Sequence, residues 1–268
     1  MEELVALDKP IEATVEGVAF ECDRIRASDK IEKEPAVLLI DGIAKLTKGN
    51  ISAVEGIAKS KKTFGLTLMM SCIARGESVV PKFLPVGSGK LAWIDTEQSK
   101  SDAHKVVKRI EYMAGGDEGL LFFGMKQYAA KERLSKTEAM LEKYGSEIDV
   151  LVIDGIRDFV RDFNNPIESS DMVALLMKWT VDFDMHICVV LHANKSDGNM
   201  RGHLGTELEN KSETVFKIAK MDNMKDTSEV SEKFGRGKNI EPFMFTINDR
   251  GMPELIEGDG IDTDDAPY

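Results

Sequence analysis

The stretch "EGIAKSKKTF", residues 55–64, matches most of the pattern G-x-x-x-x-G-K-[ST], in which a glycine-rich loop cradles phosphate groups. Gly56, Lys62 and Thr63 fall on the first, seventh and eighth positions of this pattern. The sixth position, which is glycine in the pattern, holds Lys61. Whether this stretch forms a phosphate loop therefore depends on its surroundings and on the backbone that the sixth position requires.

The segments on either side favour a phosphate loop. The apolar run "NISAVEG" precedes it and indicates a strand, and "KTFGLTLMMSCIAR" follows with a helical pattern. The first N–H groups of a helix are unpaired and attract anions. A second Gly-Lys pair, Gly89–Lys90, lacks a following Ser or Thr and precedes a strand, so we reject it. The residues expected to line the nucleotide are Gly56, Ala58, Lys59, Ser60, Lys61, Lys62, Thr63 and Phe64.

Lys61 leaves two interpretations open. The missing glycine matters only where the sixth position needs a positive φ or a very close backbone approach. Otherwise the Lys61 side chain turns outward at the mouth of the loop and adds positive potential near the phosphates. The alternative is a solvated lysine-rich turn between a strand and a helix. In a working loop, Lys62 meets the outer phosphates and the Thr63 hydroxyl faces Mg²⁺.

Three further apolar runs deliver polar side chains to strand ends. "VLVIDG" ends in Asp154, which would hold Mg²⁺ opposite Thr63, since open α/β sheets bind ligands at the carboxyl ends of their strands. "LAWIDTEQ" ends in Asp95 and Glu97, which strand alternation places on one side, with Thr96 pointing away. One of these two carboxylates would orient a water. "HICVVLH" ends in His192, a candidate γ-phosphate sensor or a structural histidine.

Composition sets limits on the class of protein. The chain has 268 residues, 42% hydrophobic residues and a formal net charge of −12. No apolar run approaches the ~20 residues of a membrane helix, so no membrane partner is expected. The first residues are acidic and predict a cytoplasmic protein. The three cysteines form no close pair, and the acidic total argues against a surface covered by nucleic acid, although a local basic path is compatible with it.

The pattern along the chain predicts an α/β fold with a mostly parallel sheet and antiparallel strands near its C-terminal end. We expect helices near 99–115 and at 169–184, the second capped by Ser or Asp. The late strands near 214–221 and 242–249 would be separated by a polar loop holding "KFGRGKN". The expected organisation is an N-terminal arm or small subdomain (1–35), one domain that carries the phosphate loop (36–252) and an acidic tail (253–268).

The phosphate loop, "WIDTEQ", "VLVIDG" and "VVLHANK" follow one another in an order that resembles the RecA-like P-loop ATPases, specifically hexameric helicases of the RepA and DnaB type from plasmids and mobile elements. The resemblance covers roughly residues 36–250 and implies ATP and Mg²⁺ as ligands. It also implies roles for matching residues. Lys62 is the phosphate lysine, Thr63 and Asp154 hold the metal, Glu97 polarises the water with Asp95 as the alternative, and His192 is the sensor. Loops of this family often carry a basic residue in place of the second glycine.

The same resemblance implies nucleic acid and a second subunit as partners. The segment 194–215 takes the place of a loop that faces DNA in the family, and its cations are Lys195, Arg201, His203 and Lys211. Such contacts to phosphate oxygens position DNA without reading its sequence. Family members act as rings, commonly hexamers, in which a basic finger completes the neighbouring site. Arg236 and Lys238 lie near the matching place, although in the order Arg-Gly-Lys instead of the Lys-x-Arg of many replicative helicases.

Three functions remain open at this point. The first is a DNA-dependent ATPase motor, such as a replicative helicase or a mobilisation ATPase of a mobile element acting on single-stranded DNA. The second is a nucleotide-switched assembly factor that works with replication or mobilisation proteins and separates no strands. The third is a degenerate loop retained in an interaction domain, which the substitution at Lys61 would explain.

Overall fold

The computed structural model describes residues 14–15, 18–87, 89–194 and 200–256, and the chain divides into two units, Met1–Lys33 and Glu34–Tyr268. In the first unit, β1 (Thr14–Val15) and β2 (Val18–Ala19) pair in antiparallel fashion, and a short 3-10 helix follows at Glu21–Asp23. Within the described part of the chain, the helices are too short or too polar to span a bilayer. All site residues discussed below belong to the second unit.

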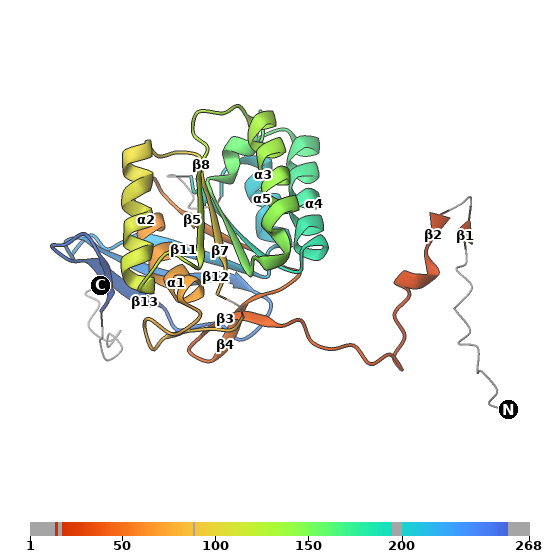
Figure 1. Ribbon diagram of the computed structural model, residues 1–268, viewed down its shortest axis with the longest axis horizontal. Coiled ribbons are helices and arrows are strands. Elements are labelled where there is room, and N and C mark those ends of the chain that lie inside the picture. The colour runs from red at the N-terminus through yellow and green to blue at the C-terminus, as the bar shows by residue number, and fades with distance from the viewer. Residues whose placement is uncertain (1–13, 16–17, 88, 195–199, 257–268) are drawn as a thin grey trace, which may run out of the picture. The chain divides into compact units, whose positions relative to one another are not determined.

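A large sheet forms the centre of the second unit (Figure 1). Its order is β14-β13-β12-β11-β5-β10-β9-β7-β8. The strands from β8 to β11 in this order run parallel, whereas β12, β13 and β14 each run antiparallel to the neighbour before them. The prediction of a mostly parallel sheet with antiparallel C-terminal strands is confirmed. The strands are β5 (Ile51–Gly56), β7 (Leu91–Asp95), β8 (Leu120–Gly124), β9 (Val150–Asp154), β10 (His186–His192), β11 (Thr214–Lys220), β12 (Thr227–Gly235), β13 (Phe243–Ile247) and β14 (Pro253–Leu255).

Helices cover both faces of the parallel part, which explains why its strands are apolar almost throughout. In β9, Val150 and Val152 enter one core, and Leu151 and Ile153 enter the other. The first core contains side chains of α1 (Lys62–Arg75) and α2 (Lys100–Ala114). The second contains side chains of α3 (Ala130–Tyr144), α4 (Pro166–Asp182) and α5 (Gly202–Lys211).

A smaller antiparallel sheet contributes side chains to the first core, the one that contains α1 and α2. It has the order β4-β3-β6 and consists of β3 (Ala36–Ile40), β4 (Ile43–Thr47) and β6 (Phe83–Pro85). The helix α1 packs against β6 as well as against β5 and β7 of the large sheet, so most of its residues are buried. This enclosure fixes the start of α1, where the phosphate loop ends.

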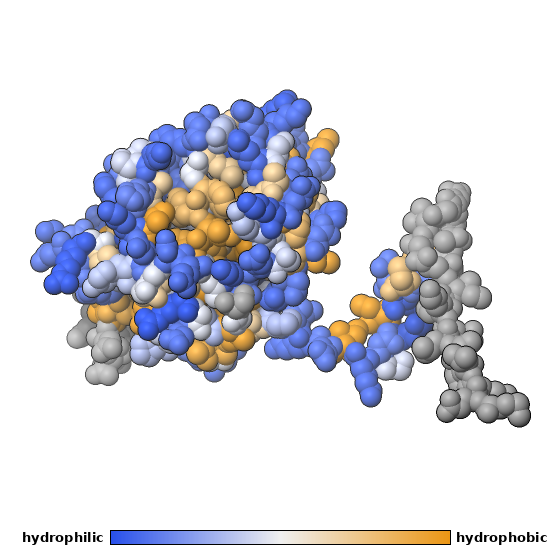
Figure 2. Space-filling view, in the orientation of Figure 1, coloured by the Kyte–Doolittle hydropathy of each residue, from blue (hydrophilic) through white to orange (hydrophobic). Residues whose placement is uncertain are grey.

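Figure 2 shows an apolar hollow on the side of the molecule in view, over β8 and between α2 and α3. Side chains of β8 and α2 line a cavity here, among them Phe122 of β8 with Ala103 and Val107 of α2. Its lining also includes Lys100, His104 and Lys126. β8 is the last strand of the sheet on this side, so its outer edge has no partner strand among the described residues.

Several elements differ from the sequence prediction. The helix α4 begins at Pro166, and Asn165 caps it by accepting hydrogen bonds from the N–H groups of Ile167 and Glu168. Proline at the first helical position has no N–H to leave unpaired, so it favours this earlier start. The predicted polar loop before β13 contains the strand β12, and the predicted DNA-facing loop contains α5. The strand β14 lies inside the range that we assigned to the acidic tail.

Candidate nucleotide-binding site

The loop between β5 and α1 has the backbone of a phosphate loop. A Cβ atom added to Gly56 would lie 2.4 Å from the carbonyl oxygen of Ile218, so only glycine fits the first position of the pattern. Lys61, at the sixth position, has φ of +66°, which is the left-handed conformation that glycine adopts most easily. The carbonyl of Lys61 accepts hydrogen bonds from the N–H groups of Phe64 and Gly65 at 3.0 and 3.1 Å. The sixth position therefore requires a positive φ, and lysine adopts it here.

The side chain of Lys61 makes a contact that the sequence did not predict. Its Nζ atom lies 3.2 Å from Oδ1 of Asp226, which precedes β12. Because this carboxylate partly neutralises the ammonium, Lys61 adds less positive potential near the loop mouth than an outward-turned, unpaired side chain would. The side chain of Lys61 is only 14% exposed, and it still lines the cavity described below.

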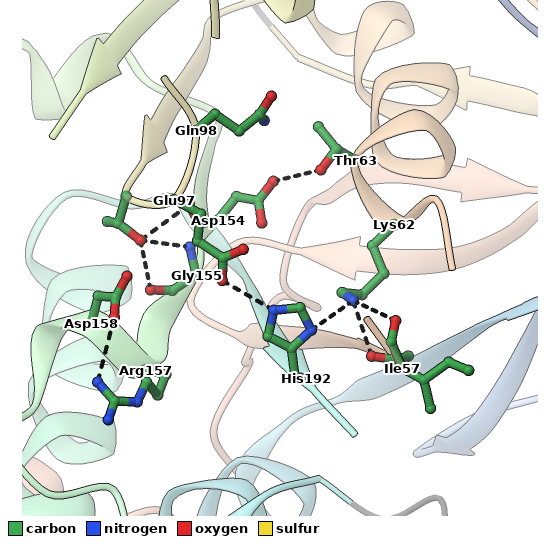
Figure 3. A network of polar contacts seen from close by, with 12 residues as sticks. Ile57, Lys62, Thr63, Glu97, Gln98, Asp154, Gly155, Arg157, Asp158 and His192 are labelled. Carbon is green, nitrogen blue, oxygen red and sulfur yellow. Dashed lines mark hydrogen bonds and ion pairs between the residues drawn. The ribbon is translucent and has the colours of Figure 1, made fainter. Parts of the chain in front are cut away.

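Lys62 is the buried cation of the site. Its Nζ atom donates to the carbonyls of Gly56 and Ile57 at 3.0 and 3.1 Å and lies 3.1 Å from Nδ1 of His192 (Figure 3). Burial lowers the pKa of Lys62, while the carboxylates of Asp154 and Glu97 oppose that shift. An ammonium group only donates hydrogen bonds. In this arrangement Nδ1 of His192 is therefore an acceptor.

His192 joins Lys62 to Glu97. With Nδ1 accepting from Lys62, the ring proton lies on Nε2, which is 3.2 Å from Oε1 of Glu97 and donates to it (Figure 3). This hydrogen bond lowers the pKa of Glu97, against the opposing effect of burial. Glu97 is thus kept ionised, and it is held by a residue that also contacts Lys62.

Thr63 and Asp154 meet on the other side of Lys62. The Thr63 hydroxyl donates to Oδ2 of Asp154 at 3.0 Å. Burial raises the pKa of Asp154 to about 7, with the nearby charges of Asp95 and Glu97 acting in the same direction. A hydroxyl and a carboxylate in contact, in a place with an excess of negative charge, are a donor set that suits a small divalent cation.

Asp95 orders the turn after β7 and uses its carboxylate there. Its Oδ1 atom accepts from the backbone N–H groups of Glu97 and Gln98, and Oδ2 accepts from the Gln98 side chain at 2.7 Å. The expectation that Asp95 and Glu97 share one side of an extended chain is therefore wrong, because the strand ends at Asp95 and the chain turns. Thr96 binds across to β9, with its N–H 2.8 Å from the Asp154 carbonyl.

A cavity of about 470 Å³ connects these groups with α2. Besides the phosphate-loop residues, it contains residues that the sequence reasoning missed. On α2, the guanidinium carbon of Arg109 lies 3.9 Å from the ring centre of Phe64, and Arg109 Nε donates to the carbonyl of Gly251. The lining residues are Lys59, Lys61, Lys62, Thr63, Phe64, Glu97, Gln98, Asp102, Lys105, Val106, Arg109, Asp154 and His192.

The remaining loop residues lie outside this cavity. Ala58 and Ser60 line a separate hollow of about 290 Å³ behind the loop, together with Lys59, Lys61 and Asp226. Ser60 is 1% exposed, and its carbonyl accepts from the Ser228 hydroxyl of β12 at 3.2 Å. These contacts fix the loop on the side away from the cavity.

The sequence located Arg109 only as a residue on a predicted helix. Its aromatic partner, Phe64, comes from another helix, so no signal in the sequence predicted the contact between them.

Of the basic residues assigned to DNA and to the finger, the five that the structure describes do not line the cavity of their own chain. Lys195 lies outside the described residues. Arg201, His203 and Lys211 are exposed, but Arg201 and Lys211 lie at opposite ends of α5. Arg236 is also exposed, and its Nη2 atom donates to the Lys211 carbonyl at 3.2 Å. The exposed Lys238 accepts a hydrogen bond from Lys45 through its carbonyl.

Comparison with known proteins gives the family. A model of the AAA domain family matches residues 19–198, which include the phosphate loop, Glu97, Asp154 and His192. The chain belongs to the AAA domain family. Curated protein sequences give no significant match.

Among solved structures, this AAA domain protein is similar to a chain described as an ATPase domain, with 13% sequence identity and a TM-score of 0.57. The likeness covers 79% of this chain and 86% of the other. At this identity the likeness concerns the fold. Family, fold and loop geometry together make the protein a RecA-like P-loop ATPase domain.

Proposed function

We propose that this protein binds Mg²⁺-ATP in the cavity between the phosphate loop and α2, hydrolyses it, and uses the reaction to act on single-stranded DNA as a helicase-type motor. The observation that carries the hydrolytic part is the contact series from Lys62 through His192 to Glu97, beside the pair of Thr63 and Asp154. These groups supply a phosphate cation, a sensor, a water-orienting carboxylate and metal ligands within one cavity.

The loop would hold the triphosphate by its backbone and by Lys62. The backbone N–H groups at the start of α1 would face the phosphates, as at other helix N-termini. Lys62 now donates to the carbonyls of Gly56 and Ile57, and phosphate oxygens are stronger acceptors for the same ammonium. Binding therefore exchanges carbonyl partners for phosphate partners without a large movement of the side chain.

Thr63 and Asp154 would hold Mg²⁺, which would supply positive charge beside the outer phosphates. Glu97 is the best-placed group to orient the attacking water and accept its proton, because it is ionised and lines the cavity. His192 contacts both Lys62 and Glu97. A movement of Lys62 toward the phosphates would therefore reach Glu97, and the water that it orients, through the imidazole ring. Asp95 supports this arrangement by fixing the turn that carries Glu97.

The base of the nucleotide would lie toward α2. There the cavity is lined by Val106 and by Arg109, whose planar group already stacks on Phe64. A flat cation beside an aromatic ring offers a surface for a purine ring. We therefore assign Arg109 to the base.

The DNA and ring parts of the proposal rest on the exposed cations. Arg201, His203 and Lys211 on α5 would contact DNA phosphates, and Arg236 with Lys238 would reach a neighbouring subunit. Exposure of Arg236 outside its own cavity fits a finger that acts on a neighbour in a ring. The likeness in fold to a solved ATPase domain supports the motor part of the proposal and does not extend to DNA or to a ring.

The second candidate is an ATP-switched assembly factor without strand separation. The net charge of −12 favours it, since such a chain offers little attraction for DNA outside local basic patches. A strand-separation assay with ATP separates the two: ATP-dependent unwinding supports the motor and excludes the switch. Nucleotide-dependent association with another protein, without unwinding or DNA binding at low salt, would support the switch.

A further inference from the structure

An ionic group with one fully buried member adjoins the strand that leads into the phosphate loop, and its members do not line the cavity. The Nζ atom of Lys233, on β12, lies 3.0 Å from Oε2 of Glu55 and 2.8 Å from Oε1 of Glu209. Glu55 is fully buried on β5 and immediately precedes Gly56, and Glu209 lies on α5. One ammonium thus connects the phosphate-loop strand with α5.

Glu209 also fixes the chain that follows the sensor strand. Its Oε1 atom accepts a hydrogen bond from the backbone N–H of Met200 at 3.3 Å. Met200 pairs with Ala193, and the N–H of Arg201 donates to the carbonyl of His192. The carboxylate of Glu209 therefore holds the point where the chain returns to the end of β10, beside the sensor His192.

The burial of Glu55 costs folding free energy that an apolar side chain at the same place would not cost. Glu55 has no exposure, burial raises its pKa, and its Oε1 atom makes no hydrogen bond within the described part of the chain. Apolar residues of similar size often stabilise a core as well as a buried ion pair or better. Two carboxylates also share one ammonium. A movement of Glu55 on β5 or of Glu209 on α5 would therefore act on the same ammonium, as a link between these two elements requires.

We propose that Lys233 is a positioning residue that couples the occupancy of the ATP site to the position of α5 and of the chain at Met200 and Arg201. The proposal rests on the proposed ATP binding in the cavity. Phosphate binding draws Lys62 from the carbonyls of Gly56 and Ile57, and Gly56 adjoins Glu55 in β5. A shift of Glu55 reaches Glu209 through Lys233. Since coupling between sites is reciprocal, ligands that move α5 would change ATP affinity by the same factor.

Hydrogen exchange of the amides of residues 200–211 tests the link, measured with and without Mg²⁺ and a non-hydrolysable ATP analogue. The variants are Lys233→Met, Lys233→Arg and Glu209→Gln. The controls are Lys131→Met and Glu207→Gln. Lys131 is an exposed lysine on α3, which carries no member of the ionic group, and Glu207 shares α5 with Glu209. Analogue affinity is measured in parallel by titration.

In the wild type and both controls, we expect the analogue to change exchange in residues 200–211. Lys233→Met should lose this change and bind the analogue about 5-fold more weakly or worse, and Lys233→Arg should restore both. Glu209→Gln keeps the Lys233–Glu55 pair, so it should bind the analogue yet transmit less to α5. Glu209→Gln therefore still tests the coupling if Lys233→Met does not fold.

Two results would overturn the inference: tight analogue binding by the wild type with unchanged exchange in residues 200–211, or an unchanged response in both Lys233→Met and Glu209→Gln. Failure of the proposed ATP site looks different. If the proposed ATP site is wrong, the wild type itself would not bind the analogue. That result would reject the ATP site and the coupling together.

Discussion

Thr63 and Asp154 lie 91 residues apart in the sequence, and the Thr63 hydroxyl donates a hydrogen bond of 3.0 Å to the Asp154 carboxylate. Thr63 is in the first turn of α1, and Asp154 ends β9. The parallel sheet brings the ends of β5, β7, β9 and β10 to the same edge, so residues from four distant segments meet in one cavity.

Mg²⁺ should strengthen ATP binding through this pair. We expect Asp154→Asn to lower the enhancement of ATP binding by Mg²⁺ by about tenfold or more. Binding measured in EDTA should change much less, because Lys62 and the loop backbone remain. Titration of a fluorescent ATP analogue with and without Mg²⁺ measures both values. Asp158→Asn, which alters a carboxylate outside the cavity, serves as the control. An unchanged Mg²⁺ effect in Asp154→Asn would contradict the metal assignment.

Glu97→Gln should bind ATP with nearly normal affinity and lose hydrolysis by about 100-fold or more, because the amide cannot accept the proton of the attacking water. Asp95→Asn separates orientation from chemistry. It weakens the turn that holds Glu97, so it should lower both the hydrolysis rate and the thermal stability. Single-turnover hydrolysis and nucleotide titration give the two quantities. Equal losses of binding and turnover in Glu97→Gln would argue against its role.

The left-handed conformation at position 61 should make glycine a better substitute than alanine. Both substitutions remove the ion pair with Asp226, but alanine keeps the strain of a positive φ, whereas glycine relieves it. We expect the free energy of unfolding of Lys61→Gly to be about 1 kcal/mol larger than that of Lys61→Ala. Urea denaturation measures both values. Alanine as stable as glycine would mean that the loop in solution has another backbone.

Arg236 should act on a neighbouring subunit. Arg236→Ala should bind ATP normally and lose hydrolysis by about 10³-fold. Lys62→Ala is inactive for a different reason, since its own phosphate site is damaged. Mixing the two variants should restore part of the activity, because some interfaces then combine an intact Lys62 site with an intact Arg236. A mixture as inactive as its components would exclude action in trans, and Lys238→Ala shows which cation is needed.

The buried His186 should make the fold sensitive to acid. The ring is fully buried, with Nδ1 donating to the Thr47 carbonyl and Nε2 accepting from Ser52. Burial lowers the pKa of His186 to about 4, even though Glu213 lies 3.4 Å from Nδ1. Burial outweighs the hydrogen bond to the Thr47 carbonyl, which acts to raise the pKa.

Since the unfolded chain takes up this proton near its ordinary pKa of about 6.5, the stabilisation is complete above that pH. It is lost as pH falls from about 6.5 toward 4, by about 3 kcal/mol. Urea unfolding across this range should show the loss in wild type and a flatter profile in His186→Gln. The exposed His104→Gln is the control and should follow the wild type. Parallel profiles for wild type and His186→Gln would contradict the assignment.

The strands that deliver the site were predictable because each is a short apolar run ending in a polar residue. The runs ending at Asp154 and His192 form β9 and β10 with the expected ends. Local pattern also located α2, which Ser99 caps through its side chain. These features depend on residues close together in sequence.

The rest depends on contacts between distant segments. Nothing in the sequence around Arg109 indicates that Phe64 lies beneath it, and nothing near Lys61 indicates Asp226 as its partner. Asp95 was misread because strand alternation was extended beyond the end of the strand. The strand β12 was missed since it carries Glu232 and Lys233, whose charges are paired inside the protein with Lys45 and Glu55.

Steady-state ATP hydrolysis by wild type, Lys62→Ala and Lys61→Ala, with and without single-stranded DNA, tests the central claim most directly. We predict Mg²⁺-dependent hydrolysis in the wild type that rises with DNA, substantial activity in Lys61→Ala, and none above background in Lys62→Ala. Hydrolysis that persists in Lys62→Ala, or a wild type that neither binds nor hydrolyses ATP, would contradict the account.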